Sequence, residues 1–191
     1  AAMMSYGSTT AKAQTPRPEY PRPQFERSEW VNLNGTWTYS FDFGRTGRDK
    51  GWQNNASFDG KITVPFCPES SLSGVKYTDF INTIWYQRKI DIPAAWNGKK
   101  ILLNFGAVDY EAHIFIDGKL VRRHFGTGSS FSCDITKFVK AGQQHNLVVL
   151  VNDNLRDHKQ PGGKQSFGFY SAGCNYTRVT GIWQTVWMEA V

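Results

Sequence analysis

The sequence is poor in cysteine and has no long apolar run, and each absence excludes a class of protein. Its 191 residues include only three cysteines, Cys67, Cys133 and Cys174. An odd number at wide spacing fits neither a disulfide framework nor a zinc site, so we expect small buried side chains and at most one bridge. No stretch approaches the roughly 18 apolar residues of a membrane-spanning helix, so we expect no membrane partner.

The motifs of metal, phosphate and nucleotide chemistry are also missing. The four histidines, at positions 113, 124, 145 and 158, show no H-x-H or H-E-x-x-H spacing. No G-x-S-x-G, P-loop or G-x-G-x-x-G motif occurs, and we expect no metal and no cofactor. The net charge is +6, but the basic residues are scattered and form no stripe. We therefore expect no nucleic acid partner.

Carboxylates suited to acid–base catalysis are not evident. Asp109 and Glu111 lie two apart, which on a strand places them on one face, and we expect that face to be the exposed one of an antiparallel sheet. Asp153 lies in a loop, where turn capping and a salt bridge to Arg156 are the simpler roles. We predict no catalytic residue in this chain.

Aromatic residues are abundant, at 15% with seven tryptophans, and they follow a period of two. Four prolines between residues 16 and 23 predict an extended arm laid over a surface. Asp117-Gly118 supplies the positive-φ turn of a hairpin over residues 110–124. The predicted strands lie within residues 33–44, 61–65, 84–93, 98–108, 110–124, 129–153 and 176–191.

This pattern predicts an all-β sandwich of eight or more strands, with no amphipathic helix and only one turn of helix within residues 129–153. The length suits one domain, which we place at residues 20–191, after a disordered segment at 1–19. In the closing strand, Ile182, Gln184, Val186 and Met188 should share one face. Two long irregular segments interrupt the strands, at residues 66–83 and 154–175, and long loops are often functional.

Five segments in order resemble the N-terminal sugar-binding domain of family 2 glycoside hydrolases, over about residues 20–191. They are WVNLNGTWTYSFD, ITVPFCPES, TIWYQRKIDIP, the run from ILLNFGAVDYEA to NLVVLVND, and GIWQTVWMEAV. The resemblance implies a galactose-binding-like jelly roll. It also implies two partners in the same polypeptide: an immunoglobulin-like sandwich and a TIM barrel that carries both catalytic glutamates.

The resemblance further implies a loop, just before the last strand, that touches the sugar at the barrel mouth. Counting back from Gly181 places Asn175 where relatives have an aspartate. Asn175 either binds a sugar hydroxyl or caps a turn. Arg178 either supports the loop or pairs with a barrel carboxylate. Lys164 and Gln165 are candidate contacts to sugar or to the neighbouring domain.

Glu69, in the other long loop, is the last candidate, with a loop salt bridge as its alternative role.

The resemblance predicts a non-catalytic module of a retaining β-glycosidase, β-galactosidase-like, whose carbohydrate ligand is a β-linked glycoside. A free-standing carbohydrate-binding module, or a module that only docks other domains, are the alternatives. No intact signal sequence is visible, and a cleaved one would make the protein periplasmic or secreted.

Overall fold

The computed structural model describes residues 14–55 and 57–191. Most of the segment that we expect to be disordered, residues 1–19, lies outside this range. In the part of this segment that the structure describes, the carbonyl oxygens of Pro16 and Arg17 accept hydrogen bonds from the Asn34 side chain, at 3.1 and 3.3 Å. No helix in the described ranges is long and apolar enough to cross a membrane.

The chain is built from strands joined by single turns of helix. The strands are β1 (Trp30–Asn32), β2 (Gly35–Phe41), β3 (Gly60–Val64), β4 (Thr83–Asp91), β5 (Ile101–Phe105), β6 (Val108–Asp109), β7 (Glu111–Ile116), β8 (Lys119–Phe125), β9 (Phe131–Asp134), β10 (Gln144–Asn152), β11 (Gly181–Ile182) and β12 (Val186–Ala190). The helical turns are η1 (Pro23–Phe25), α1 (Trp52–Asn55), η2 (Ser71–Ser73), η3 (Ala94–Trp96) and η4 (Thr136–Phe138).

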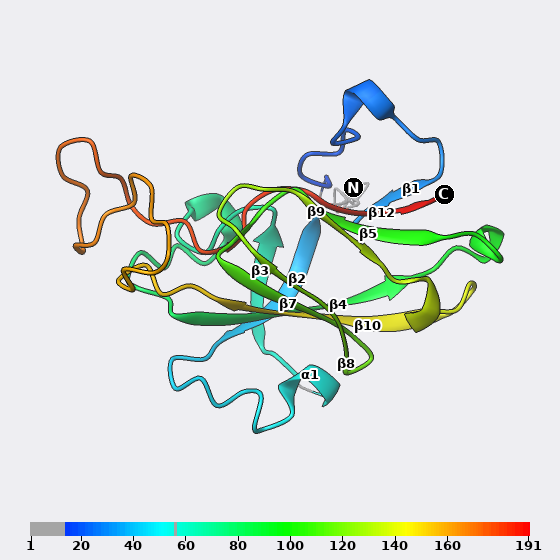
Figure 1. The fold of residues 1–191 in the computed structure, drawn as a ribbon, viewed down its shortest axis with the longest axis horizontal. Coiled ribbons are helices and arrows are strands. Elements are labelled where there is room, and N and C mark those ends of the chain that lie inside the picture. The colour runs from blue at the N-terminus through cyan, green and yellow to red at the C-terminus, as the bar shows by residue number, and fades with distance from the viewer. Residues whose placement is uncertain (1–13, 56) are drawn as a thin grey trace, which may run out of the picture.

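Two antiparallel sheets face each other (Figure 1). The smaller has the order β1-β12-β5-β9, and the larger has the order β3-β2-β4-β10-β7-β8. A two-stranded pair, β11 with β6, lies outside both sheets. Neighbours in these orders are rarely consecutive in sequence, as expected of a jelly roll. The prediction of an all-β jelly-roll sandwich is confirmed.

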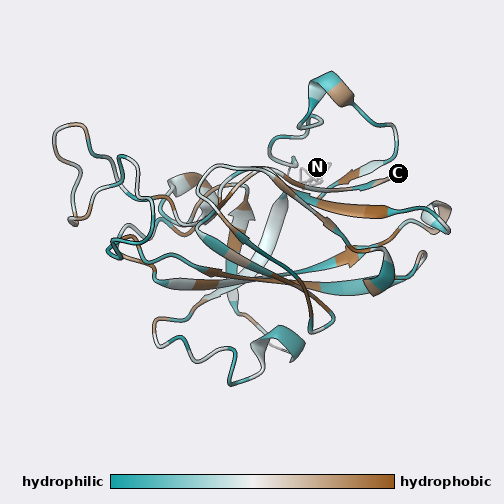
Figure 2. Cartoon of the chain, viewed as in Figure 1, coloured by the Kyte–Doolittle hydropathy of each residue, from teal (hydrophilic) through white to brown (hydrophobic). Residues whose placement is uncertain are grey.

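Strand β10 shows why the central strands read as continuous apolar runs. Leu147, Val149 and Val151 point into the main core between the sheets, whereas Val148 and Leu150 join a second cluster with Trp85 and Phe115. The loop that carries α1 covers this second cluster on the outer face of the larger sheet (Figure 1). A strand buried on both faces has no polar face to alternate. Figure 2 shows the resulting apolar colouring along strands of both layers.

The predicted hairpin forms at its expected turn. Asp117 and Gly118 have φ angles of 46° and 78°, and Ile116 pairs with Lys119 across the turn between β7 and β8. Positive φ at both central residues matches the twist of the flanking strands. The Asp117 carboxylate also accepts a hydrogen bond from the Asn146 amide at 2.8 Å, which ties the turn to β10.

The proline-rich arm lies over the outer face of the smaller sheet, as predicted (Figure 1). Tyr20 is buried there, and its hydroxyl donates to the Glu189 carboxylate at 2.7 Å. The Tyr20 ring also meets the edge of Trp30, with 5.1 Å between centroids. The arm is therefore held by specific contacts to β1 and β12.

The closing strand is split, which differs from the prediction of one continuous strand. β11 pairs with β6, whereas β12 pairs with β1 and β5. Val186 and Met188 share the core face as expected, but Gln184 is exposed in the connection between the two strands. The Gly106 amide donates to the Thr185 carbonyl at 2.9 Å, which closes this connection against the end of β5.

The three cysteines are all free, in three different environments. Cys133 on β9 is buried, Cys67 is half-buried and Cys174 is exposed. The expectation of buried side chains is confirmed for Cys133 and wrong for Cys174, because residue 174 lies in a loop that projects from the sandwich.

Candidate functional site

A long loop, residues 153–180, projects from one end of the sandwich between β10 and β11 (Figure 1, orange). It contains no regular strand, only isolated bridges that join Gln165 to Tyr176 and Ala172 to Asn175. We call it the 153–180 loop. Four of the five predicted site residues lie in it, and Glu69 lies beneath it.

Thr180 fastens the end of the 153–180 loop to two buried carboxyl groups. Its backbone amide donates to Glu69 Oε2 at 3.2 Å, and its hydroxyl donates to Asp153 Oδ2 at 3.0 Å. Asp153 also accepts from Gln160 Nε2 at 2.6 Å. The start and the end of the loop are thus joined through one carboxyl group.

Gln165 joins the middle of the loop to the sandwich. Its Nε2 donates to Asp109 Oδ2 at 2.9 Å, while its Oε1 accepts from the Val179 amide at 2.7 Å. The side chain is 4% exposed. A buried amide with both ends bonded fixes the loop geometry, because breaking either bond leaves a desolvated polar group.

Arg178 holds the loop through backbone carbonyls. Its guanidinium donates to the carbonyl oxygens of Ser166 at 3.2 Å, Gly168 at 2.5 Å and Thr78. The carbon of the guanidinium lies 4.1 Å from the centroid of the Phe80 ring. Arg178 is 3% exposed, so it braces the loop and is not on its surface.

The carboxyl groups beneath the loop are strongly perturbed. Burial raises the pKa of Glu69 to about 7. Burial, together with the nearby charge of Asp153, raises the pKa of Asp109 to about 8. Burial also raises the pKa of Asp153. Glu69 Oε1 and Asp109 Oδ1 have no hydrogen-bond partner among the described residues. Desolvation without a cation partner favours the neutral acid.

These positions correct three expectations. Asp109 is buried, not on an exposed face with Glu111. Glu69 forms no salt bridge in the described part of the chain and accepts from a backbone amide instead. Asp153 bonds to Gln160 and Thr180, not to Arg156, whose guanidinium lies 3.7 Å from the centroid of the Phe80 ring.

Asn175 and Lys164 lie farther out on the loop. Asn175 and Ala172 exchange two backbone hydrogen bonds of 3.0 and 3.2 Å, which close a tight turn. The Asn175 Nδ2 donates to the Gln165 carbonyl at 3.5 Å. Lys164 is exposed, and its carbonyl accepts from the Tyr176 amide at 2.9 Å. The structure therefore brings Asn175 next to Gln165 and separates it from Glu69.

The tip of the loop exposes aromatic side chains. Phe167, Phe169 and Tyr170 are 54%, 57% and 86% exposed, and Tyr176 is 49% exposed. Phe169 meets the edge of Phe80, with 5.5 Å between centroids. Aromatic side chains that are exposed together are typical of surfaces that contact a partner.

The carboxyl groups beneath the 153–180 loop are placed to position the loop and not to cleave a glycosidic bond. Glu69, Asp109 and Asp153 are 7%, 2% and 5% exposed. A cavity beside Asp153 and Thr180 measures about 150 Å³, below the roughly 300–1,000 Å³ of ligand pockets. A glycoside cannot reach these carboxyl groups, so they shape the loop. The sequence analysis did not predict this role for Asp109, Asp153 and Thr180. Asp109 ends strand β6, Asp153 directly follows β10 and Thr180 directly precedes β11.

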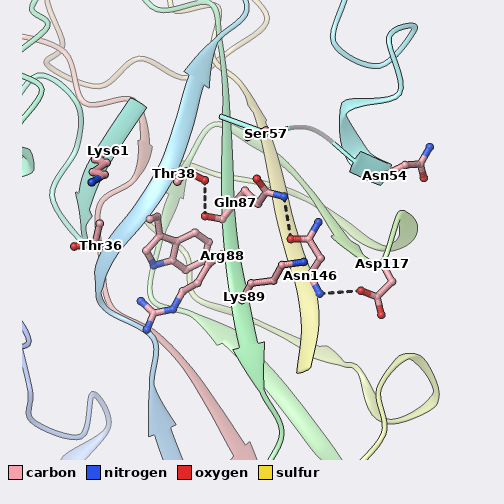
Figure 3. Close-up of a pocket in the computed structure, with 11 residues that line it drawn as sticks. Thr36, Thr38, Asn54, Ser57, Lys61, Gln87, Arg88, Lys89, Asp117 and Asn146 are labelled. Carbon is pink, nitrogen blue, oxygen red and sulfur yellow. Dashed lines mark hydrogen bonds between the residues drawn. The ribbon is translucent and has the colours of Figure 1, made fainter. Parts of the chain in front are cut away.

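A separate polar groove of about 1120 Å³ crosses the outer face of the larger sheet. Figure 3 shows Thr38, Gln87 and Asn146 on adjacent strands, joined by hydrogen bonds of 3.3 and 3.0 Å. Lys61 and Lys89 also line the groove. None of the predicted site residues lies there.

Comparisons with known proteins agree on one domain type. A family model described as "Glycosyl hydrolases family 2, sugar binding domain" matches residues 30–188. A β-glucuronidase of Felis catus is 29% identical over 150 residues, which cover 72% of this chain and 23% of that protein. A β-galactosidase of Thermoanaerobacter pseudethanolicus is 28% identical over 116 residues, which cover 60% of this chain and 14% of that protein.

Solved structures show the same fold. A Ruminococcus gnavus β-glucuronidase superimposes with a TM-score of 0.71 at 22% identity, covering 87% of this chain and 29% of that one. The chain therefore spans about a quarter of the length of the glucuronidases that it matches.

Proposed function

Because the chain belongs to the sugar-binding domain family of the family 2 glycosyl hydrolases, we propose that it is the non-catalytic N-terminal module of a retaining β-glycosidase. The family match over residues 30–188 carries this proposal. Its ligand is a β-linked glycoside, of the glucuronide or galactoside class that the names of the relatives indicate. Its partners are an immunoglobulin-like sandwich and a catalytic barrel in the same polypeptide.

In this proposal the 153–180 loop completes the substrate pocket of the barrel. Asn175, on the outer part of the loop, supplies an amide that both donates to and accepts from a sugar hydroxyl. Lys164 contacts the neighbouring domain. Gln165, Arg178 and Glu69 position the loop from below, since each side chain is buried and bonded to the loop backbone.

The catalytic carboxyl pair belongs to the barrel. A retaining glycosidase needs two accessible carboxyl groups about 5–5.5 Å apart, one on each side of the scissile bond. The buried carboxyl groups beneath the 153–180 loop are closed to a sugar, as their exposed fractions of 2–7% indicate.

The test uses chromogenic β-D-glucuronide and β-D-galactoside substrates. The 191-residue chain should release no chromophore above the uncatalysed rate, because the carboxyl groups at its candidate site, Glu69, Asp109 and Asp153, are closed to a sugar. Turnover that persists after repeated purification would contradict the proposal.

A second experiment addresses the longer polypeptide. Sequencing the gene beyond codon 191 should reveal an immunoglobulin-like sandwich and a barrel with two catalytic glutamates. In that enzyme, Asn175→Ala should lower kcat/KM by roughly 5- to 160-fold, the effect of about 1–3 kcal/mol for a lost hydrogen bond to substrate. An unchanged kcat/KM would remove Asn175 from the site.

A further inference from the structure

A cleft of about 910 Å³ lies between the proline-rich arm and the connection from β11 to β12. We call it the arm cleft. Arm residues Arg17 and 19–23 line it on one side, and residues 183–185 with Trp187 line it on the other. We propose that the arm cleft is a second binding site, for a pyranose sugar, separate from the 153–180 loop.

Trp183 gives the cleft an aromatic wall. The side chain is half-buried, and its Nε1 donates to the Thr127 carbonyl at 2.8 Å. Because the polar edge of the indole is already satisfied, the surface left for the cleft is the apolar ring. A rigid ring of this kind is a stacking surface for the C–H face of a sugar.

Trp187 gives the cleft a buried aromatic wall. The side chain is 1% exposed, and the Arg22 guanidinium lies 5.1 Å from the centroid of its ring. Its Nε1 finds no acceptor among residues 14–55 and 57–191, but this atom is as closed to a sugar as the carboxyl groups beneath the 153–180 loop. Trp187 therefore backs the cleft, and Trp183 supplies the aromatic surface that a sugar contacts.

The polar groups of the cleft, which include the cations Arg17 and Arg22, combine donors with acceptors. Gln184 and Ser130, both exposed, can donate and accept, and Glu19 can accept. Glu19 also pairs with Arg17 at 2.7 Å. A phosphate needs donors only, whereas a sugar hydroxyl uses one donor and one acceptor at once.

The cleft is large enough and its walls are fixed. Its volume lies within the roughly 300–1,000 Å³ of ligand pockets. Asn32 Nδ2 donates to the Arg17 carbonyl at 2.9 Å, and the Tyr20 hydroxyl donates to Glu189. Preformed walls lower the ordering cost of binding.

The site is independent of the proposed function. The arm lies over the smaller sheet, whereas the 153–180 loop projects from the far end of the sandwich (Figure 1). A sugar in the arm cleft therefore requires neither the barrel nor Asn175.

The experiment titrates the 191-residue chain with D-galactose, D-glucuronic acid and cellobiose and records tryptophan indole N–H signals by NMR. We expect a saturable shift of the Trp183 indole signal, assigned with Trp183→Phe, as a sugar stacks on its ring. The three probes separate a neutral ring, a carboxylated ring and a disaccharide. No saturable shift with any of them would overturn the proposal.

Two glycine variants provide a matched test. A Cβ built at Gly128 lies 3.8 Å from Trp183 Cζ2, so Gly128→Leu fills the cleft beside the indole without a backbone clash. It should weaken sugar binding at least roughly tenfold by steric exclusion. Gly44→Leu, whose Cβ would meet only Thr46, should bind as the unmodified chain does.

Asn175→Ala tests whether the sugar binds in the arm cleft or on the 153–180 loop, and it should leave the Trp183 shift unchanged. Binding that is lost in Asn175→Ala and kept in Gly128→Leu would place the sugar on the loop and refute the arm cleft. The proposed enzyme module would survive that result, because it is tested by turnover and by the longer polypeptide.

Discussion

Asp109 holds its proton at neutral pH because burial raises its pKa to about 8. Its ordinary pKa is near 3.8, so the folded chain binds a proton between about pH 4 and pH 8 that the unfolded chain releases. The contribution of this proton to stability is complete below about pH 4 and is lost as pH rises through about 8. Deprotonation would place an uncompensated charge against Asp153 and beneath Gln165.

We predict that Asp109→Asn removes this pH dependence. The amide keeps an acceptor for Gln165 and carries no charge. Between pH 5 and pH 9 the unmodified chain should lose roughly 1 kcal/mol or more of unfolding free energy relative to the variant. Thermal unfolding at the two pH values measures the difference, which corresponds to about 2–4 °C in Tm per kcal/mol at this size.

An exposed aspartate provides the control for Asp109. Asp59→Asn changes the same charge on the surface and should lose stability with pH as the unmodified chain does. If Asp109→Asn and the unmodified chain respond alike to pH, Asp109 is ionised in the folded protein and the raised pKa is refuted.

Alternation along the sequence could not predict the burial of Asp109. Period two places Asp109 and Glu111 on one face only if they belong to one strand. In the structure Asp109 ends β6, which pairs with β11, whereas Glu111 begins β7, which pairs with β10. The change of partner at Tyr110 turns one carboxylate inward, and no local signal marks it. Tertiary pairing decides the face.

At the scale of elements, Gly181 controls how β11 enters the sandwich. Its φ is 77°, and a Cβ there would lie 2.0 Å from the Tyr86 hydroxyl oxygen. Tyr86 is fully buried and cannot move aside. Gly181 adjoins Thr180, whose amide and hydroxyl fasten the 153–180 loop, so a change here acts on the loop as well.

We predict that Gly181→Ala destabilises the chain by two separable effects. Positive φ costs an L-residue roughly 1–2 kcal/mol, and overpacking against Tyr86 adds about 1–3 kcal/mol. Gly98→Ala is the matched control, because Gly98 has a φ of 78° and no atom within 4 Å of its Cβ position. Denaturant unfolding of both variants measures the difference; equal losses would mean that Tyr86 yields to the added methyl group.

Elements with a strong local signal were predicted correctly, and those set by pairing were not. The Asp117-Gly118 hairpin formed as expected because its turn requires only local φ angles. The closing strand is interrupted between Ile182 and Val186 because its first part, β11, pairs with β6 and its second part, β12, pairs with β5. Alternation continues through such a break and does not reveal it.

At the scale of the whole molecule, sequence patterns predicted the architecture of two packed sheets but not the order of the strands within each sheet. Alternating aromatic strands without helical periodicity require two packed sheets, since each strand must bury a face. The order β3-β2-β4-β10-β7-β8 depends on contacts between residues far apart in sequence. The candidate site depends on them even more, because Glu69 meets Thr180 across 111 positions. The resemblance pointed to the loop and to Glu69, Gln165 and Arg178. The contributions of Asp109, Asp153 and Thr180 came only from the fold.

Tyr170 extends this reasoning to the longer enzyme. The side chain is 86% exposed in this chain, so Tyr170→Ala should change its unfolding free energy by less than about 0.5 kcal/mol. If the aromatic tip docks on a catalytic barrel, the same change should lower kcat/KM of the longer enzyme roughly fivefold or more. Phe25→Ala, 78% exposed at the end of η1 in the proline-rich arm, should leave kcat/KM unchanged. Equal effects of the two variants on kcat/KM would show that the tip has no partner of its own.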